Sequence, residues 1–475
     1  MAKYGVFVTE QQTSVSTPVV ADVGIPFVIG CAPIQAAESP AAVGVPTLCT
    51  SWGEFVSQFG WSDDWDTYNL CEVAYSHFKL YGVQPAIFVN LLDPSTMKTA
   101  VAADDMDVIG RKVTLPIGTI HSSVVVKAAG GSGDAWAVDT DYTVYSEDGV
   151  TYVELLATSS HANATSINIA YSTVNTATIT AAYVASKMDT VDLCLSTIGM
   201  VPDIMIAPGY SSTPTVAAIM ATKAAGINGL FRAKAIIDID CSSATGAART
   251  YSDVYTVKTN NNLVDENEIL CWPMVKLGGY KFHLSTQLAG LMASVDTENG
   301  GYPYDVASNY GLKIDGLCLA DGTAVIQTKA QADTLRDKGI VTALNFGSNG
   351  WVSWGAYTAC YPANTDVKDY FISVSRMFDF VGNTLIQTFW SKVDRPMTRI
   401  LLDNVQDTVN AWLTGLTGAN YILGGRCEII ADENPVTNLI AGIIKFHIYM
   451  TPPVPAQEID FVLEYDVDYL TAALS

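Results

Sequence analysis

Residue types that could do chemistry are few in this chain and poorly spaced for it. None of the histidines has a second histidine, a cysteine or a carboxylate at the spacing of a zinc site. The five histidines are His77, His121, His161, His283 and His447. No Gly-Lys dipeptide occurs, which excludes the phosphate-binding loop of nucleotide hydrolases. We therefore expect surface or core histidines, with no catalytic residues, no cofactor and no metal site.

Two pairs of aspartates could hold a metal ion, because residues two apart on a strand point to the same side of a sheet. The pairs are Asp238 with Asp240 and Asp466 with Asp468. Both lie in runs where apolar and polar residues alternate, so we expect solvated strand faces and no metal site.

The composition is that of a folded protein with a strongly acidic surface. The chain has 475 residues, 49% apolar and 15% charged, which is enough for two or three domains and excludes disorder. The formal net charge of -23 opposes binding to nucleic acid and makes copies of the chain repel one another. Any assembly of copies must overcome that repulsion through backbone pairing and apolar burial.

Cysteine usage and hydropathy favour a protein made in a cytosol. Nine cysteines, an odd number with no C-x-x-C pair, predict reduced thiols, and the N-terminus lacks the pattern of a secretory signal. The longest apolar run, 439–450, contains Lys445 and His447. We expect this run to be a buried strand, with no direct membrane insertion.

The elements predicted along the chain alternate between strands and helices, which favours an α/β body. Short apolar runs predict strands, and helical spacing closed by glycine predicts helices. Strands are expected over 25–30, 46–50, 86–92, 204–209 and 235–239, and helices over 52–60, 70–80, 215–225 and 397–416. The last helix has an apolar face of Leu402, Val405, Val409, Trp412, Leu413 and Leu416, with Gly418 beyond its end.

A block of different composition interrupts this alternation between about Pro94 and Ala185. It consists of short runs of Thr, Val, Ala and Ser, and Asp148-Gly149 separates two alternating segments, which predicts a hairpin. Since the α/β pattern resumes at Val191, we expect an inserted all-β domain, in the form of a small sandwich.

Both ends of the chain alternate with a period of two. Toward the C-terminus the apolar positions Ile459, Phe461, Leu463, Tyr465, Val467 and Tyr469 alternate with mostly acidic ones. The stiff segment 451–455, rich in proline, precedes them. Near the N-terminus, Tyr4, Val6 and Val8 alternate with Gly5, Phe7 and Thr9. A tethered strand at each end can pair with neighbouring copies, so the sequence predicts a polymer.

The same segments, in order, resemble the contractile tail sheath proteins of bacteriophages and related injection machines. The resemblance covers 4–93 and 190–470. Its motifs follow one another in the same order as in that family, and this shared order makes the resemblance specific. In the W-G-x-R-T motif of that family, matched by 354–358, Tyr357 stands where arginine is usual. The other matching positions are YGVFVTE at 4–10, the run 23–32, PTLCTSWGEF at 46–55, FG at 59–60, LAG at 288–290, Ala293, Asp296, GG at 300–301, SN at 308–309, GG at 424–425, EN at 433–434, Gly442, PP at 452–453, PA at 455–456, EI at 458–459 and Phe461.

The resemblance implies a structural protein, not an enzyme, that polymerises helically around an inner tail tube and contracts to drive the tube through a bacterial envelope. Its arms insert strands into adjacent subunits; here these would be Tyr4, Val6, Phe7 and Val8, and Ile459, Phe461, Leu463 and Tyr465. It docks on the tube through a helix of the C-terminal domain, here 397–416, with Arg395 and Arg399 as candidate tube-facing residues. The implied partners are identical subunits, the tube protein, and baseplate and terminator proteins. The implied location is a virion tail or a headless bacteriocin-like particle, assembled in the host cytoplasm.

Five segments follow from these patterns. They are an N-terminal arm (1–20), a sheath core (21–93 and 190–345), an outward-facing inserted β domain (94–189), a C-terminal sheath domain (346–450) and a C-terminal arm (451–475). An extracellular adhesin or surface-layer protein is the alternative that the β insert and acidic charge favour, although no secretory signal is present. A soluble α/β enzyme such as a hydrolase is opposed by the missing triad and metal spacing.

Overall fold

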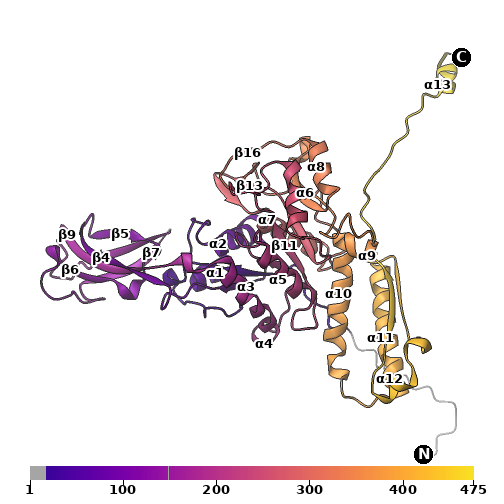
Figure 1. Ribbon diagram of the computed structural model, residues 1–475, viewed down its shortest axis with the longest axis horizontal. Coiled ribbons are helices and arrows are strands. Elements are labelled where there is room, and N and C mark those ends of the chain that lie inside the picture. The colour runs from indigo at the N-terminus through magenta and orange to yellow at the C-terminus, as the bar shows by residue number, and fades with distance from the viewer. Residues whose placement is uncertain (1–17, 148, 475) are drawn as a thin grey trace, which may run out of the picture.

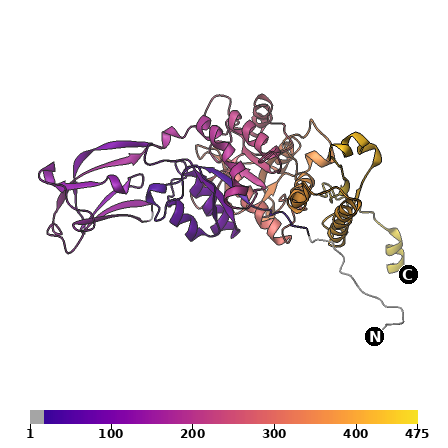
Figure 2. The same cartoon turned by 90° about the horizontal axis from the view of Figure 1, so that it is seen from below.

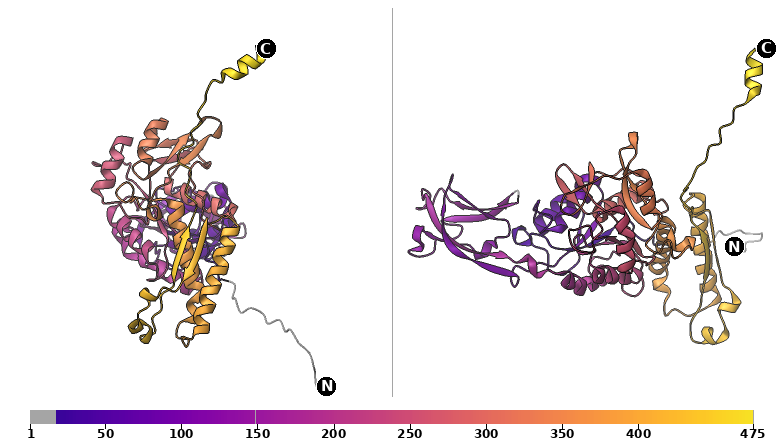
Figure 3. Two further views of the ribbon diagram at one scale, coloured as in Figure 1. Left: turned by 90° about the vertical axis from the view of Figure 1, so that its right-hand side faces the viewer. Right: turned by 45° about the horizontal axis from the view of Figure 1, so that its top comes forward.

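The computed structural model describes residues 18–147 and 149–474. Three parts follow one another along the long axis of the molecule: a β block, a central α/β domain and a pair of long helices with a small sheet (Figures 1 and 2). The last residues leave the body as an extended segment that ends in a short helix (Figure 3).

The centre of the molecule is an eight-stranded sheet in the order β18-β17-β12-β11-β10-β1-β3-β2. The pairs from β3 to β17 are parallel, and only the outermost pairs, β2 with β3 and β17 with β18, are antiparallel. Its strands are β1 (Pro26–Gly30), β2 (Thr47–Cys49), β3 (Ala86–Asn90), β10 (Ile204–Ile206), β11 (Lys234–Asp238), β12 (Glu268–Cys271), β17 (Ile340–Asn345) and β18 (Trp351–Trp354). Inner strands such as β1, β3 and β11 are buried along their whole length, as continuous apolar runs in a parallel sheet require.

Helices flank this sheet, although helical spacing predicts only those over 52–59, 69–81 and 214–225. The helices are α1 (Trp52–Phe59), α2 (Asn69–Ala74, continued by a π-helix over Tyr75–Tyr81), α3 (Ala181–Lys187), α4 (Cys194–Thr197), α5 (Pro214–Ala225), α6 (Tyr251–Asn260), α7 (Leu284–Glu298) and α8 (Lys329–Arg336). In α1, Ser51 Oγ accepts from Glu54 N at 3.2 Å, and the helix ends at Gly60, whose φ is +75°. A Cβ on Gly60 would lie 2.4 Å from Pro33 O, so only glycine fits this end.

A smaller antiparallel sheet lies beside the central one. Its order is β14-β13-β15-β16, and its strands are β13 (Met274–Leu277), β14 (Tyr280–Phe282), β15 (Gly316–Cys318) and β16 (Ala324–Val325).

The β block consists of two three-stranded antiparallel sheets, β4-β9-β6 and β5-β8-β7. The strands are β4 (Lys98–Asp107), β5 (Lys112–Pro116), β6 (Val125–Ala128), β7 (Tyr142–Glu147), β8 (Val150–Leu155) and β9 (Ser166–Val174). Both sheets contribute to one hydrophobic core, for example through Val153 of β8 and Ile169 of β9. The block leaves and rejoins the central domain at one place, because Asn175 N donates to Met97 O at 2.8 Å.

The block is shorter than its change of composition suggests. Residues 181–193 are helical, and Val184, Met188 and Val191 belong to the core of the central domain. Their spacing of four and three residues is helical, and small residues around them hide it. The prediction of strands up to about Ala185 is therefore wrong after Val174.

The third part of the molecule is built on two long helices, α10 (Ile372–Phe389) and α11 (Arg399–Gly418) (Figure 1). Around them are α9 (Val367–Tyr370), α12 (Val436–Ile440) and a two-stranded antiparallel sheet of β19 (Gly424–Glu428) and β20 (His447–Thr451). Val409, Leu413 and Leu416 of α11 are buried against α10. The helix begins two residues later than predicted and contains Gly418 instead of ending before it.

The prediction of one buried strand over 439–450 is wrong. Residues up to Ile440 finish α12, and only His447 onward is strand. The cause is Asn434, whose Oδ1 accepts from Lys445 N at 2.7 Å and whose Nδ2 donates to Lys445 O at 3.0 Å. This carboxamide closes 435–445 into a loop, which leaves Ile440 and Ile443 exposed.

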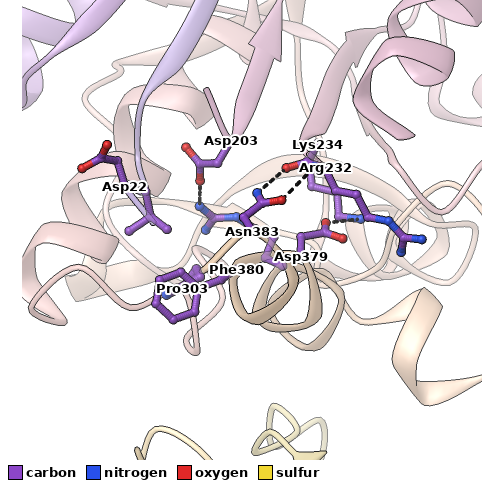
Figure 4. A pocket seen from close by; sticks show the side chains of 10 residues that line it. Asp22, Asp203, Arg232, Lys234, Pro303, Asp379, Phe380 and Asn383 are labelled. Carbon is purple, nitrogen blue, oxygen red and sulfur yellow. Dashed lines mark hydrogen bonds and ion pairs between the residues drawn. The ribbon is translucent and has the colours of Figure 1, made fainter. Parts of the chain in front are cut away.

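A buried ionic cluster joins α10 to the central domain (Figure 4). Arg376 contacts Asp296 at 2.6 Å and Asp203 at 2.7 Å, and Lys234 Nζ lies 2.9 Å from Asp379. Burial alone would lower the pKa of Arg376, but the two carboxylates outweigh it and raise that pKa above its ordinary value. The cavity among these groups measures about 10 Å³, room for no more than a water molecule. The cluster is therefore a joint between two domains and not a ligand site.

Candidate assembly surface

His121, His447 and His161 have local partners in the structure, whereas among the described residues both ring nitrogens of His77 are buried without a side-chain hydrogen bond. His121 Nε2 lies 2.8 Å from Ser146 Oγ, and His447 Nδ1 lies 2.8 Å from Glu433. The His161 ring stacks on Trp136 at 4.0 Å. Burial lowers the pKa of His77 to about 4. Within 18–147 and 149–474, no three His, Cys, Asp or Glu side chains lie close enough to hold a metal ion.

His283 is part of a buried charged network. Its Nδ1 lies 2.8 Å from Glu72 Oε2, and its backbone N–H donates to Glu72 Oε1 at 2.6 Å. Burial opposes its charged form, but Glu72 and the nearby Asp238 outweigh burial and raise the pKa of His283 to about 9. The imidazole is therefore a cation at neutral pH and ties α2 to the start of α7.

The interpretation of Asp238 as part of a solvated strand face is wrong. Asp238 is buried, and its carboxylate accepts from Ser285 Oγ at 2.5 Å and from Ser285 N at 3.0 Å. An inner strand of a parallel sheet is covered on both sides, so alternation on β11 does not lead to solvent. Asp240 instead accepts from Ser242 N in the loop after the strand.

The second aspartate pair does not lie on a strand either. Asp466 Oδ1 accepts from Asp468 N at 2.9 Å, at the start of the helix α13 (Val467–Leu474). The predicted strand over 459–469 is absent from the structure of the single chain: 459–466 have no regular structure, and Val467 and Tyr469 are helical. A strand needs a neighbour to complete its hydrogen bonds.

The apolar side chains of this C-terminal segment face solvent. Exposed fractions range from 71% for Ile459 to 94% for Leu463, with Phe461 and Tyr465 between them. Soluble monomers rarely expose such a continuous apolar series, which is typical of an interaction site.

Gln457, just before the segment, is hydrogen-bonded to the body of the molecule. Gln457 Oε1 accepts from Arg336 Nη2 at 2.8 Å and from the Tyr357 hydroxyl at 3.1 Å. The Arg336 guanidinium stacks on Trp354 at 4.5 Å, and Tyr357 packs against Tyr361 at 4.3 Å. Tyr357, at the position where the resembling motif has arginine, therefore helps to fix where the segment leaves the body.

The N-terminal candidates Tyr4, Val6, Phe7 and Val8 lie outside the described residues. The chain enters the described part along α10, where Val19 N donates to Thr388 Oγ1 at 3.0 Å and Ala21 N donates to Thr384 Oγ1 at 3.1 Å.

The small sheet β19–β20 has two unequal edges. On β19, Cys427 N donates to Asn410 Oδ1 at 2.7 Å, and Asn410 Nδ2 donates to Cys427 O at 3.1 Å. The carboxamide of Asn410 thus replaces a neighbouring strand at this point, and α11 covers that edge.

The edge of β20 is open. Backbone groups alternate in direction along an antiparallel strand, so Ile448, which lies opposite Cys427, turns its N–H and C=O away from β19, and Met450 does the same. In the described parts of the chain these outward groups have no hydrogen-bond partner. Such an edge accepts an added strand.

The candidate tube-facing arginines flank the start of α11. Arg395 lies in the turn between α10 and α11, and Arg399 is the first residue of α11. Arg399 Nε contacts Asp403 Oδ1 at 2.9 Å while its side chain is 87% exposed. The two arginines lie on the surface near one end of the helix pair.

An apolar groove lies between α10, α11 and the loop before β20. It has a volume of about 990 Å³, and Phe389, Val405 and Ile443 are among its lining residues. Among the described residues no helix is both long and apolar enough to cross a membrane.

The structure combines an α/β body with an exposed C-terminal segment and an open sheet edge. The sheath of an extracellular contractile injection system, in its contracted state, has the same fold: the TM-score is 0.59, with 14% identity and 99% of both chains covered.

Curated relatives point to the same class. A tail sheath protein of Burkholderia phage BcepMu is 24% identical over 408 residues, which cover 82% of this chain and 83% of that protein. The tail sheath protein of Escherichia phage P2 is 24% identical over 269 residues, which cover 56% of this chain and 63% of that protein. No protein-family model matches the chain. The resemblance to contractile tail sheath proteins is confirmed by these relatives and by the fold.

Proposed function

We propose that this chain is the structural subunit of a contractile tail sheath. It polymerises helically around an inner tail tube, and its contraction drives the tube through the bacterial envelope. The names of the relatives support this function, and the exposed C-terminal segment together with the open β20 edge carries it.

The C-terminal segment 459–465 of one copy adds as a strand to β20 of another. Its alternating side chains match the two faces of a sheet, and the outward backbone groups of Ile448 and Met450 supply the hydrogen bonds that the segment lacks. Tyr4, Val6, Phe7 and Val8 act in the same way at the other end of the chain.

Energetics explain why the segment pairs only on a neighbour. Ordering a residue costs roughly 1–2 kcal/mol of backbone entropy, and a hydrogen bond returns a net of about 0.5–1.5 kcal/mol. Burial of Phe461, Leu463 and Tyr465 must supply the difference. A second copy offers that burial and the single chain does not.

The tube-facing surface is the side of α11 near Arg395 and Arg399. Asp403 neutralises part of the charge of Arg399, which weakens the attraction of Arg399 to a partner surface. Identical subunits, the tube, the baseplate and a terminator protein are the partners, and the particle is a phage tail or a headless relative assembled in the host cytoplasm.

The β block faces outward and is not needed for polymerisation. It lies at the end of the molecule opposite α10 and α11 (Figure 2), and Met97 and Asn175 bring its two ends together. A contracting tube moves its subunits outward, so mass at the outer radius obstructs neither the tube nor the arms.

Negative-stain microscopy of the purified full-length chain tests the function. A sheath subunit forms hollow helical tubes, whereas a surface-layer protein forms flat lattices and an enzyme stays a discrete particle. Flat sheets or monomers at every salt concentration would contradict the proposal.

A further inference from the structure

The apolar groove between α10 and α11 needs an occupant. Leu385 and Phe389 of α10, Val405 of α11, and Ile443, Phe446 and Ile448 line it. Val393 and Met397, in the turn between the helices, remain exposed at its border. An apolar groove of about 990 Å³ bordered by exposed apolar side chains is large enough to take a helix face.

The helix α13 has the complementary shape. Val467, Leu470 and Leu474 follow one another at i, i+3 and i+7, the spacing with which an amphipathic helix anchors in a groove. Leu470 and Leu474 are exposed in the single chain. A helix of eight residues is marginal in water, so it gains most of its stability by docking.

The groove and the helix lie at opposite ends of the C-terminal part. The groove lies at the turn between α10 and α11, near α12, whereas the segment that carries α13 leaves past α9 and points away (Figure 1). A contact between different surfaces of two copies does not close on itself and generates an open helical polymer. The position of α13 therefore favours the groove of a second copy.

Two features bring α13 to this groove. Phe446 and Ile448, at the start of β20, line the groove, so a strand added antiparallel to β20 ends beside it and places the residues that follow at the groove. Glu464, Asp466 and Asp468 precede or begin α13, while Lys392, Asp394 and Arg395 give the groove one net positive charge. The charges of the two surfaces are complementary.

We propose that α13 of one copy docks in the apolar groove of the next copy and locks the added strand in place. The inference rests on the proposed function, because it requires a polymer of identical chains.

Cysteine cross-linking in assembled tubes tests the contact. The nine native cysteines are all buried, so introduced thiols react selectively under mild oxidation. Leu470→Cys combined with Val393→Cys should give a ladder of covalent oligomers, because each copy donates one helix and accepts another. Leu474→Cys with Ile443→Cys is the second pair. Tyr469→Cys with Val393→Cys is the matched control, since position 469 lies on the opposite side of the helix and should give little ladder.

The outcomes separate the contact from the function. Tubes in which neither pair gives a ladder would overturn the docking and leave the sheath function intact. A cross-link within one chain, or one from Val6→Cys to Val393→Cys in place of Leu470→Cys, would also overturn it. Failure of the unmodified protein to form tubes would overturn both. As a further check, Leu470→Ser should slow assembly about tenfold and Tyr469→Ser less than about twofold.

Discussion

The sequence predicts strands in both the β block and the C-terminal segment, but in the single chain only those of the block form. In the block, buried and partly buried residues alternate along β8, which pairs with β7 and buries Val153 and Leu155. The segment 459–465 alternates equally well, yet Leu463 is almost fully exposed. Alternation therefore specifies a strand with two faces, but a partner strand within reach decides whether it forms.

The largest predicted difference is in tube formation, between a chain that lacks the C-terminal segment and a chain that lacks the β block. Removal of 458–475 should abolish tube formation and leave the melting temperature of the body unchanged, because the segment buries little in the single chain. Deletion of 1–16 should act in the same way. Electron microscopy and thermal denaturation of the same preparations measure both effects.

Excising the β block is the matched control. A short Gly/Ser linker from Met97 to Asn175 should leave tubes intact, with a smaller outer diameter. Normal tubes after removal of 458–475 would mean that the segment is not needed for assembly. A folded monomer that no longer assembles after excision of the block would mean that the block is needed.

The same substitution placed in each region gives a sharper test. Leu155→Ala in the core of the block should destabilise the block by about 2–5 kcal/mol, because it leaves a cavity. Leu463→Ala should leave the stability of the unassembled chain unchanged and weaken assembly. Denaturant unfolding and light scattering distinguish the two. Equal destabilisation by both changes would mean that the segment packs on its own body.

The contrast also shows what the sequence can predict. Local signals suffice for the hairpin, for the helix that stops at Gly60 and for β1, β2, β3, β10 and β11 of the central sheet, but not for β12, β17 and β18. Features set by distant residues were missed: Asn434 closes a loop inside an apolar run, Asn410 caps one edge of a sheet, and Ser285 satisfies Asp238. Each of these contacts depends on side chains that only the fold brings together, so the hydrophobic periodicity of the sequence does not predict it.

Stability of the body should depend on pH through a group far from the segment. The pKa of His283 is raised to about 9 from an unfolded value of about 6.5. Its stabilising contribution is therefore fully present below pH 6.5 and is lost as pH rises through 9. At about 1.4 kcal/mol per pKa unit, the loss is up to about 3 kcal/mol.

His283→Gln isolates this contribution. The difference in free energy of unfolding between the native chain and the variant should be largest at pH 6 and should disappear by pH 10. Denaturant unfolding at each pH measures it. His447→Gln, whose partner Glu433 is half-exposed, serves as the control and should show a much smaller change. A gap that widens with rising pH would mean that His283 is neutral in the folded chain.

Salt should act on assembly and hardly at all on the body. At a net charge of -23, copies repel one another across exposed acidic faces, and the screening length falls from about 10 Å at 0.1 M salt to about 3 Å at 1 M. Strand hydrogen bonds and apolar burial are not weakened by that change, so light scattering should show faster tube growth as sodium chloride rises. The effect is the smallest of those predicted here, a few-fold in rate, because the acidic residues are spread over the whole surface. Growth that slows steadily with salt would mean that attraction between opposite charges, such as Asp466 and Asp468 with Lys392 and Arg395, outweighs the general repulsion and drives the joining of copies.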